Sequence, residues 1–260
     1  MRTLAVLPSR YKATRFPGKP LAPIAGQPMI QRVWQAAKAA EGVDRVVVAT
    51  DDERIQAAVL AFGGEVVMTD PALPSGTDRV AAALEALGES FDVIVNIQGD
   101  EPAMHPETVG VLVRLMAENP DLPLGTVACP FSNTEELFSP NIVKVITNDL
   151  GHALYFSRSP IPYLRNSQVF EQDFRPWMKP EQLALYKRHL GLYAYRPEAL
   201  RAFMKLPPHP LEQAEMLEQL RALAHGMTMG VAQTPYLSLG VDTPEDVPLV
   251  EALLKERGLA

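Results

Sequence analysis

Short apolar runs alternate along this chain with longer stretches whose apolar side chains recur every three or four residues. Runs of strand length cover residues 3–8, 45–50, 65–68, 93–98 and 124–130. Amphipathic stretches of helical length cover residues 29–40, 52–62, 78–87 and 106–118. This β-α-β-α order predicts an α/β fold, with a mostly parallel sheet that helices cover on both faces.

Start signals support three of these helices. Asp51 or Asp52 can cap the second one, because a short acidic side chain accepts hydrogen bonds from the first free backbone N–H groups. Thr77 can cap the third helix in the same way. Pro106 suits the first turn of the fourth helix, since that position needs no N–H donor.

The pattern changes after about residue 131. Strands are predicted over 143–147, 152–157, 190–195 and 228–233, and helices over 197–205, 211–224 and 243–255. Residues 148–151 have the composition of a turn between the first two of these strands. No clear linker separates the halves, so we expect a single domain, 1–260, in which the second half forms an insertion-like subdomain on the same sheet.

Composition narrows the class of protein. The 260 residues are 47% hydrophobic and 21% charged, which is ordinary for a soluble globular protein, and no apolar run is long enough to span a bilayer. Cys129 is the only cysteine, which excludes a disulfide framework and a cysteine-rich metal site. Without a signal-peptide pattern, we expect a cytoplasmic protein. The net charge of −7 argues against a general nucleic-acid binder.

The loop after the first strand is basic although the protein is acidic. Its charged side chains are Arg10, Lys12, Arg15 and Lys19, whereas the first acidic residue of the chain is Glu41. Guanidinium and ammonium groups past the carboxyl end of a strand suit a polyphosphate. The loop has neither the Walker A pattern nor the glycine-rich dinucleotide fingerprint. The alternative is a solvated basic loop that only aids solubility.

Two later segments offer carboxylates. The run 93–98 ends in Gln98 and is followed by Asp100, while Asp242 follows a strand-like run before the last predicted helix. A carboxylate in such a place can hold a hard divalent cation beside phosphate oxygens. Helix capping or a loop charge is the alternative for each. The basic loop favours the metal site, because it should emerge at the same sheet edge as Asp100.

Other segments carry weaker signals. Residues 74–79 turn into a helix, so their N–H groups could meet a base or a phosphate. His189, Gly191 and Tyr193 should share one face of a strand, although a lone strand histidine is more often structural.

The helix predicted over 211–224 has an apolar stripe. Its members are Met216, Leu217 and Leu220, which we expect in the core. Glu218 and Gln219 beside that stripe would ordinarily be solvated.

Together these segments resemble the 3-deoxy-manno-octulosonate cytidylyltransferase family, also called CMP-Kdo synthetases. The resemblance covers essentially the full chain and rests on residues 10–21, 96–102, 153–158, 188–193, 215–221 and 240–246, in this order and spacing. It implies a Rossmann-like nucleotidyltransferase fold with an inserted subdomain for sugar binding and dimerisation. It also implies that CTP and Kdo (3-deoxy-D-manno-octulosonate) give CMP-Kdo and pyrophosphate with Mg²⁺, in a cytoplasmic homodimer that supplies lipopolysaccharide synthesis.

The resemblance further implies residue roles. The residues that would bind the nucleotide are Arg10, Arg15, Lys19, Ser75, Arg79 and Gln98. Asp100 and Asp242 would hold Mg²⁺ and, with Arg10 and Lys19, form the catalytic set. The residues that would bind the sugar acid are Arg158, His189, Tyr193, Glu218 and Gln219. Residues 1–130 would thus bind the nucleotide, and about 131–260 would bind the sugar acid and the second protomer.

Two alternatives stay open. A related nucleotidyltransferase could use 8-amino-Kdo or a sialic-type acid instead of Kdo. A nucleotide-binding regulatory or scaffold protein on the same fold could lack catalysis, although the presence of Lys19, Asp100 and Asp242 argues against it. No residue stands out as the base for the sugar hydroxyl.

Overall fold

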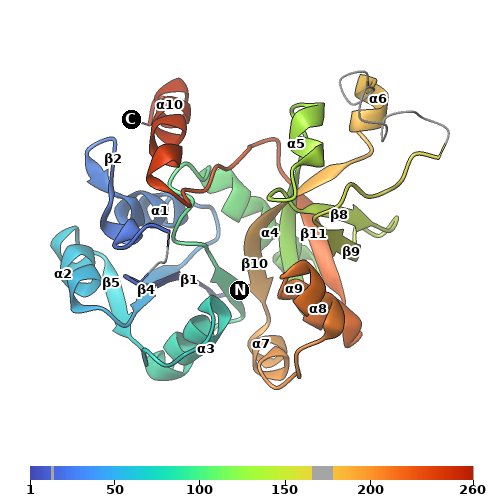
Figure 1. Cartoon of the computed structure of the whole chain (residues 1–260). Helices are drawn as coiled ribbons and strands as arrows, with labels where there is room; N and C mark the ends of the chain where they lie inside the picture. The colour runs from blue at the N-terminus through green and yellow to red at the C-terminus, as the bar shows by residue number, and fades with distance from the viewer. Residues whose placement is uncertain (13–14, 166–177, 260) are drawn as a thin grey trace.

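A central sheet runs through the protein and takes its strands from both halves of the sequence. The computed structural model describes residues 1–12, 15–165 and 178–259. The order across the sheet is β11 (Met229–Gln233), β7 (Leu124–Pro130), β10 (Lys187–Tyr195), β6 (Val93–Asn96), β1 (Thr3–Ser9), β4 (Arg45–Thr50) and β5 (Glu65–Met68) (Figure 1). A hairpin of β8 (Lys144–Thr147) and β9 (Ala153–Ser157) extends from β10.

The sheet is mostly parallel, as the alternating pattern predicts. β1 pairs in parallel with β4 and β6, β4 with β5, and β7 with β11. β10 lies between β6 and β7 and is antiparallel to both. This strand from the second half therefore joins the two sets of parallel strands.

Helices cover both faces of the sheet. One face carries α1 (Met29–Lys38), α2 (Glu53–Ala61) and α4 (Pro106–Glu118), and the other carries α3 (Gly76–Leu87), α7 (Pro197–Phe203) and α9 (Gln219–Ala224). The remaining helices are α5 (Thr134–Phe138), α6 (Pro180–Leu183), α8 (Pro210–Glu215) and α10 (Val247–Glu256). A small hairpin of β2 (Pro23–Ile24) and β3 (Gln27–Pro28) precedes α1.

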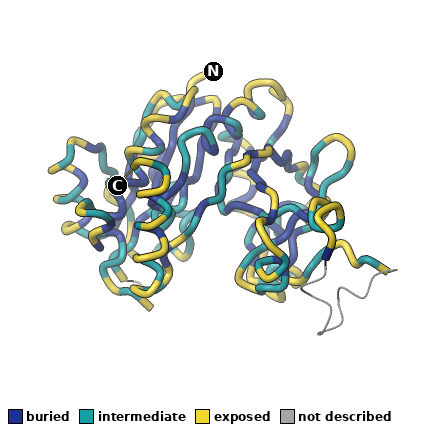
Figure 2. The backbone as a smooth tube through the Cα atoms, turned by 90° about the horizontal axis from the view of Figure 1, so that it is seen from above, coloured by how far each residue is buried: buried dark blue, intermediate teal, exposed yellow. Residues whose placement is uncertain are grey.

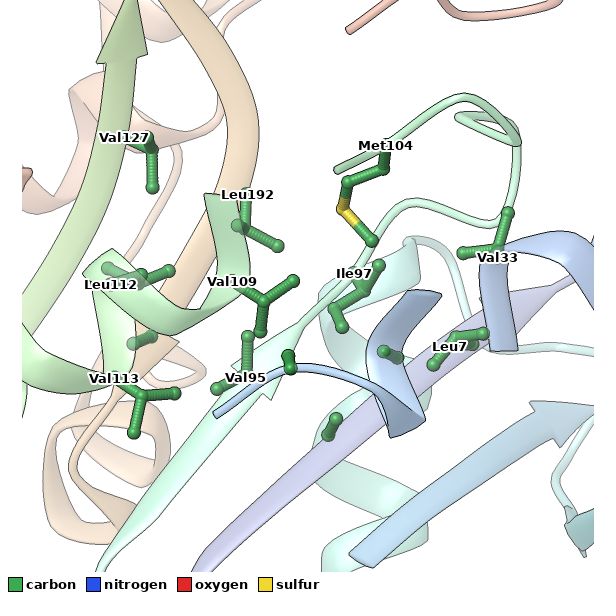
Figure 3. Packing of buried hydrophobic residues seen from close by; sticks show 14 of the residues in the cluster. Leu7, Val33, Val95, Ile97, Met104, Val109, Leu112, Val113, Val127 and Leu192 are labelled. Atoms are coloured by element: carbon green, nitrogen blue, oxygen red, sulfur yellow. The ribbon is translucent and has the colours of Figure 1, made fainter. Parts of the chain in front are cut away.

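The two largest hydrophobic clusters of the core lie one on each face of the sheet. Leu7, Val33 and Leu112 belong to the cluster on one face, whereas Val6, the neighbour of Leu7 in β1, belongs with Val80 to the cluster on the other. Figure 3 shows side chains of α4 meeting β6 in the first cluster. Buried residues follow the strands and exposed ones the outer helix surfaces (Figure 2). Within the described residues, no helix is both long enough and apolar enough to cross a bilayer.

Most predicted elements are confirmed. β4, β5, β7 and α4 match the predicted bounds residue for residue, and the other elements shift by a few residues. Asp52 caps α2, because its Oδ1 accepts from the N–H of Arg54 at 3.0 Å. β10 begins three residues before the predicted start. The last predicted helix opens with a 3₁₀ turn, Pro244–Asp246, before α10.

The predicted cap of α3 is wrong. Ser75, not Thr77, begins the helix, since the Ser75 hydroxyl accepts from the N–H of Asp78 at 3.1 Å and Asp78 accepts from the N–H of Ser75 at 3.0 Å. Thr77 is instead buried, and its hydroxyl donates to Glu218 at 2.6 Å.

The helix predicted over 211–224 is also wrong, because it is two helices. α8 ends at Glu215, and the next residue, Met216, adopts a left-handed conformation with φ of 52°. The N–H of Leu217 then returns to the carbonyl of Glu212 at 3.1 Å, as at many helix ends. Met216 is 77% exposed and leaves the predicted core stripe, whereas Leu217 and Leu220 are buried.

Candidate active site

All of the predicted site residues line two adjoining cavities past the carboxyl end of β6. The smaller cavity, of about 260 Å³, is lined by Arg10, Lys19, Ser75, Arg79, Gln98 and Asp100. The larger, of about 860 Å³, is lined by Arg15, Gln98, Asp100, Arg158, His189, Tyr193, Glu218, Gln219 and Asp242. Gln98 and Asp100 belong to both, so the two cavities meet at the end of β6.

The basic loop is folded against the end of β1. Gly18 has a positive φ of 74°, and its N–H donates to the carbonyl of Tyr11 at 2.9 Å. A Cβ at Gly18 would lie 3.0 Å from the Tyr11 hydroxyl, so the close approach favours glycine. This fold presents Lys19 to the cavity, with its side chain 15% exposed. Arg10 donates to the carbonyls of Leu73 and Ser75, which ties the loop to the segment before α3.

The two predicted metal carboxylates converge on one ammonium group. Lys19 Nζ lies 2.8 Å from Asp100 Oδ2 and 3.7 Å from Asp242 Oδ1. Arg15, which was expected on the nucleotide, pairs with Asp242 at 3.1 Å. Among the described residues, no group of three or more His, Cys, Asp or Glu is arranged to hold a metal ion. The carboxylates of Asp100 and Asp242 therefore lie close enough to share one cation, which here is the Lys19 ammonium.

Gly99 explains how Asp100 comes so close to the basic loop. A Cβ at this position would lie 2.9 Å from Ser9 Oγ and 3.2 Å from the carbonyl oxygen of Pro8. The chain leaving β6 can thus pass directly against the end of β1 only without a side chain.

Arg79 is a buried cation in the wall of the smaller cavity. Its side chain is fully buried and pairs with Asp51 at 3.1 Å, and it also donates to Thr69. Burial lowers the pKa of Arg79, while Asp51 opposes that shift. Asp51, one of the two candidate caps for α2, therefore pairs with Arg79, and Asp52 caps the helix.

His189 and Tyr193 share a side of β10, as predicted. Their ring centroids are 5.5 Å apart. Leu190 pairs with Val127 and Tyr193 with Thr126, so two extra residues of β10 are inserted there, and an even insertion preserves the alternation of side chains.

The histidine is neutral. Burial lowers the pKa of His189 to about 3. Its Nε2 lies 2.9 Å from the hydroxyl of Thr126, and that hydroxyl donates to the carbonyl of Leu192 at 2.7 Å. Nε2 is therefore the donor, which leaves Nδ1 as an acceptor. Burial also raises the pKa of Tyr193, so its hydroxyl keeps its proton.

Arg158 is held by backbone carbonyls. Its guanidinium donates to Glu215 at 2.6 Å, Pro140 at 3.0 Å and Met216 at 3.4 Å. The Glu215 side chain in turn accepts from the main-chain N–H of Arg158 at 2.9 Å and from the Ser157 hydroxyl at 2.7 Å. The break between α8 and α9 thus provides two of the three carbonyls that fix this arginine, those of Glu215 and Met216.

Glu218 and Gln219 line the cavity wall where α9 begins, rather than a solvated helix surface. Glu218 accepts from Thr77. Gln219 is buried, and its Nε2 makes no hydrogen bond within the described part of the chain. An unpartnered buried amide beside a cavity suits a polar ligand.

Sequence reasoning missed three further charged residues of the larger cavity, Glu101, Arg188 and Asp246. The pKa of Glu101 is raised, mainly because its carboxyl group is buried. Arg188 Nη1 lies 3.6 Å from a Glu136 oxygen and makes no hydrogen bond within the described residues. Glu101 follows Asp100 and Arg188 precedes His189, so their position beside predicted site residues was the signal that could have found them.

The comparisons with known proteins agree on one family. A cytidylyltransferase family profile matches residues 4–229. The 3-deoxy-manno-octulosonate cytidylyltransferase of Syntrophotalea carbinolica is 48% identical over 98% of this chain and 99% of its own length. The protein of the same name from Geobacter sulfurreducens is 45% identical over 98% of this chain and 100% of its own length.

Solved structures give the same result. CMP:2-keto-3-deoxy-manno-octonic acid synthetase complexed with CTP has a TM-score of 0.88 and 40% identity, covering 99% of this chain and 100% of that one. A cytidylyltransferase from Leptospira borgpetersenii has a TM-score of 0.60 and 14% identity, covering 99% of this chain and 95% of that one, and shares the fold.

Proposed function

Because the chain belongs to the 3-deoxy-manno-octulosonate cytidylyltransferase family, we propose that it transfers the cytidylyl group of CTP to Kdo. The anomeric hydroxyl of Kdo attacks the α-phosphorus, CMP-Kdo forms, and pyrophosphate leaves. The observation that carries this proposal is the meeting of a small cationic cavity and a larger polar cavity at Asp100 and Gln98. A nucleotide and a second substrate bound in these cavities would have their reacting groups side by side.

The smaller cavity suits the triphosphate end of CTP. Lys19 and Arg10 supply positive charge, and Ser75 lies at the N-terminus of α3, where free N–H groups favour an anion. Arg79 and Gln98 complete the nucleotide side. Arg15 pairs with Asp242, so we place it at the junction of the two cavities.

We further propose that Asp100 and Asp242 hold Mg²⁺. Mg²⁺ prefers hard oxygen ligands and is commonly bound by one or two carboxylates together with substrate phosphates, which matches this pair. Lys19 lies between the two carboxylates and offsets part of their negative charge before the substrate arrives. When bound, the metal would neutralise phosphate charge and lower the pKa of the attacking hydroxyl.

The larger cavity suits Kdo. Arg158 has five N–H donors, of which three bind the carbonyls described above, so two remain for the carboxylate of the sugar acid. Nδ1 of His189 can accept from a sugar hydroxyl. Tyr193, Glu218 and Gln219 add a hydroxyl, a carboxylate and an unpartnered amide to the same wall.

The two halves of the chain would then bind different substrates. Residues 1–130 supply Lys19, Arg10 and Asp100 for the nucleotide and the metal, and residues 131–260 supply the sugar side. Asp242 is the contribution of the second half to the metal. A homodimer would use the β8–β9 hairpin, where Leu150 is 78% exposed and Leu154 56%. The substrate CTP favours a cytoplasmic location, and the product would serve lipopolysaccharide synthesis.

The test is pyrophosphate release by the purified protein with each nucleoside triphosphate, with and without Kdo. We expect release with CTP and Kdo together, and little with either alone. Faster turnover with 8-amino-Kdo or a sialic acid would assign the enzyme to that substrate. CTP binding without turnover on any of these acids would indicate a non-catalytic nucleotide-binding protein. Light scattering of wild type and Leu154→Glu would test the dimer.

A further inference from the structure

Lys144, at the start of β8, is fully buried and lies outside the cavity lining. Its ammonium donates to three backbone carbonyls, those of Ser139 at 2.7 Å, Ile142 at 2.7 Å and Arg158 at 2.8 Å. Within the described residues it makes no salt bridge. All three of its hydrogens are therefore used on main-chain oxygens.

The three carbonyls belong to two parts of the cavity wall. Ser139 and Ile142 lie on the loop between α5 and β8, and Arg158 follows β9; all three line the larger cavity. The Arg158 side chain also donates to Pro140 on the same loop. Lys144 and Arg158 thus connect the loop to the end of β9 from two directions.

We propose that Lys144 is a positioning residue for the sugar acid: its ammonium fixes the 139–142 loop and Arg158 in the arrangement that receives the sugar carboxylate. This inference rests on the proposed function. Hydrogen bonds from a cation are stronger and more directional than apolar contacts, so they suit the fixing of a loop. This arrangement has a cost, because it takes a charged ammonium out of water.

That cost is visible at Lys144. Burial is the main cause that lowers the pKa of Lys144 to about 8. The positive charges of Arg158, just after β9, and of Arg188 on β10 lower it further, and Glu215 on α8 opposes them. A group retained under this penalty is expected to do more than fill space.

Lys187 offers a matched control. It lies on the neighbouring strand β10 and donates to the Thr147 side chain at 3.0 Å, without lining the cavity. Lys187→Met and Lys144→Met remove the same charge from adjacent strands. We expect Lys144→Met to raise the KM for Kdo at least tenfold, with a CTP Kd within twofold of wild type, and Lys187→Met to change neither. If Lys144 had a purely structural role, Lys144→Met would lower the Tm but would not raise the KM for Kdo selectively over the Kd for CTP.

A pH profile of the wild-type protein covers the case in which Lys144→Met does not fold. Above pH 8 the amine has two hydrogens for three carbonyls, so the KM for Kdo should rise between pH 7 and 9.5 in wild type and in Lys187→Met. A flat wild-type profile, or a folded Lys144→Met with wild-type KM for Kdo, would refute the inference. Absence of CMP-Kdo formation by wild type itself would instead refute the proposed function.

Discussion

Replacing Lys19 with methionine tests the cationic cavity, because it removes the ammonium while keeping most of the side-chain volume. Lys19 Nζ is 2.8 Å from Asp100 and 3.7 Å from Asp242, and the side chain is 15% exposed. A charge-assisted hydrogen bond to a phosphate at such a site contributes about 1.5–3 kcal/mol. Since about 1.4 kcal/mol is a factor of ten, the CTP Kd should increase by about 10- to 100-fold.

The carboxylates add a second effect that the assay can separate. Without Lys19, Asp100 and Asp242 would repel the triphosphate, so the loss should be larger without Mg²⁺ than with it. Calorimetric titration of CTP into the protein, with and without Mg²⁺, measures both effects. Lys12→Met is the control, because Lys12 is an exposed lysine of the same loop. Unchanged CTP affinity in Lys19→Met, or an equal loss in Lys12→Met, would refute the phosphate role.

Three further predictions concern other parts of the site. Asp100→Asn and Asp242→Asn should each lower kcat by about 10²- to 10³-fold at unchanged Tm, and near-normal turnover of either would exclude a metal role. His189 has a folded pKa of about 3, below the usual value near 6.5, so the unfolded chain binds a proton first. Stability is then lost as pH falls below about 6.5, by at most about 1.4 kcal/mol per pH unit, and denaturation of His189→Gln should show a shallower slope. Gly99→Ala should lower stability by about 1–3 kcal/mol, because its Cβ would lie 2.9 Å from Ser9 Oγ, and it should impair turnover in its folded fraction; an unchanged Tm would contradict this.

Sequence patterns predict the elements whose determinants are local. The bounds of α4 and β7 follow from the repeat of apolar positions, and the convergence of Lys19 with Asp100 follows from the rule that strand ends meet at one sheet edge. The break at Met216 could not be predicted, because Met216 fits the apolar helical spacing. The neighbouring Glu215 accepts from Ser157 at the end of β9, a long-range contact that no local pattern encodes. Lys144 was missed for a similar reason, since a lysine in a strand pattern indicates an exposed position.

The insertion of β10 between β6 and β7 is the feature that joins the two cavities, and no local pattern encodes it. Tyr193 is paired with Asn96, two residues before Gln98. The antiparallel strand therefore brings the residues proposed to bind the sugar acid close to the carboxyl end of β6. Gly191 lies beside Gln98, and a Cβ there would come within 3.6 Å of the Gln98 side chain. A parallel strand in this place would run in the opposite direction and would carry His189 away from Asp100. The direction of β10, which is set by long-range pairing alone, is therefore what would bring the proposed acceptor substrate beside the nucleotide.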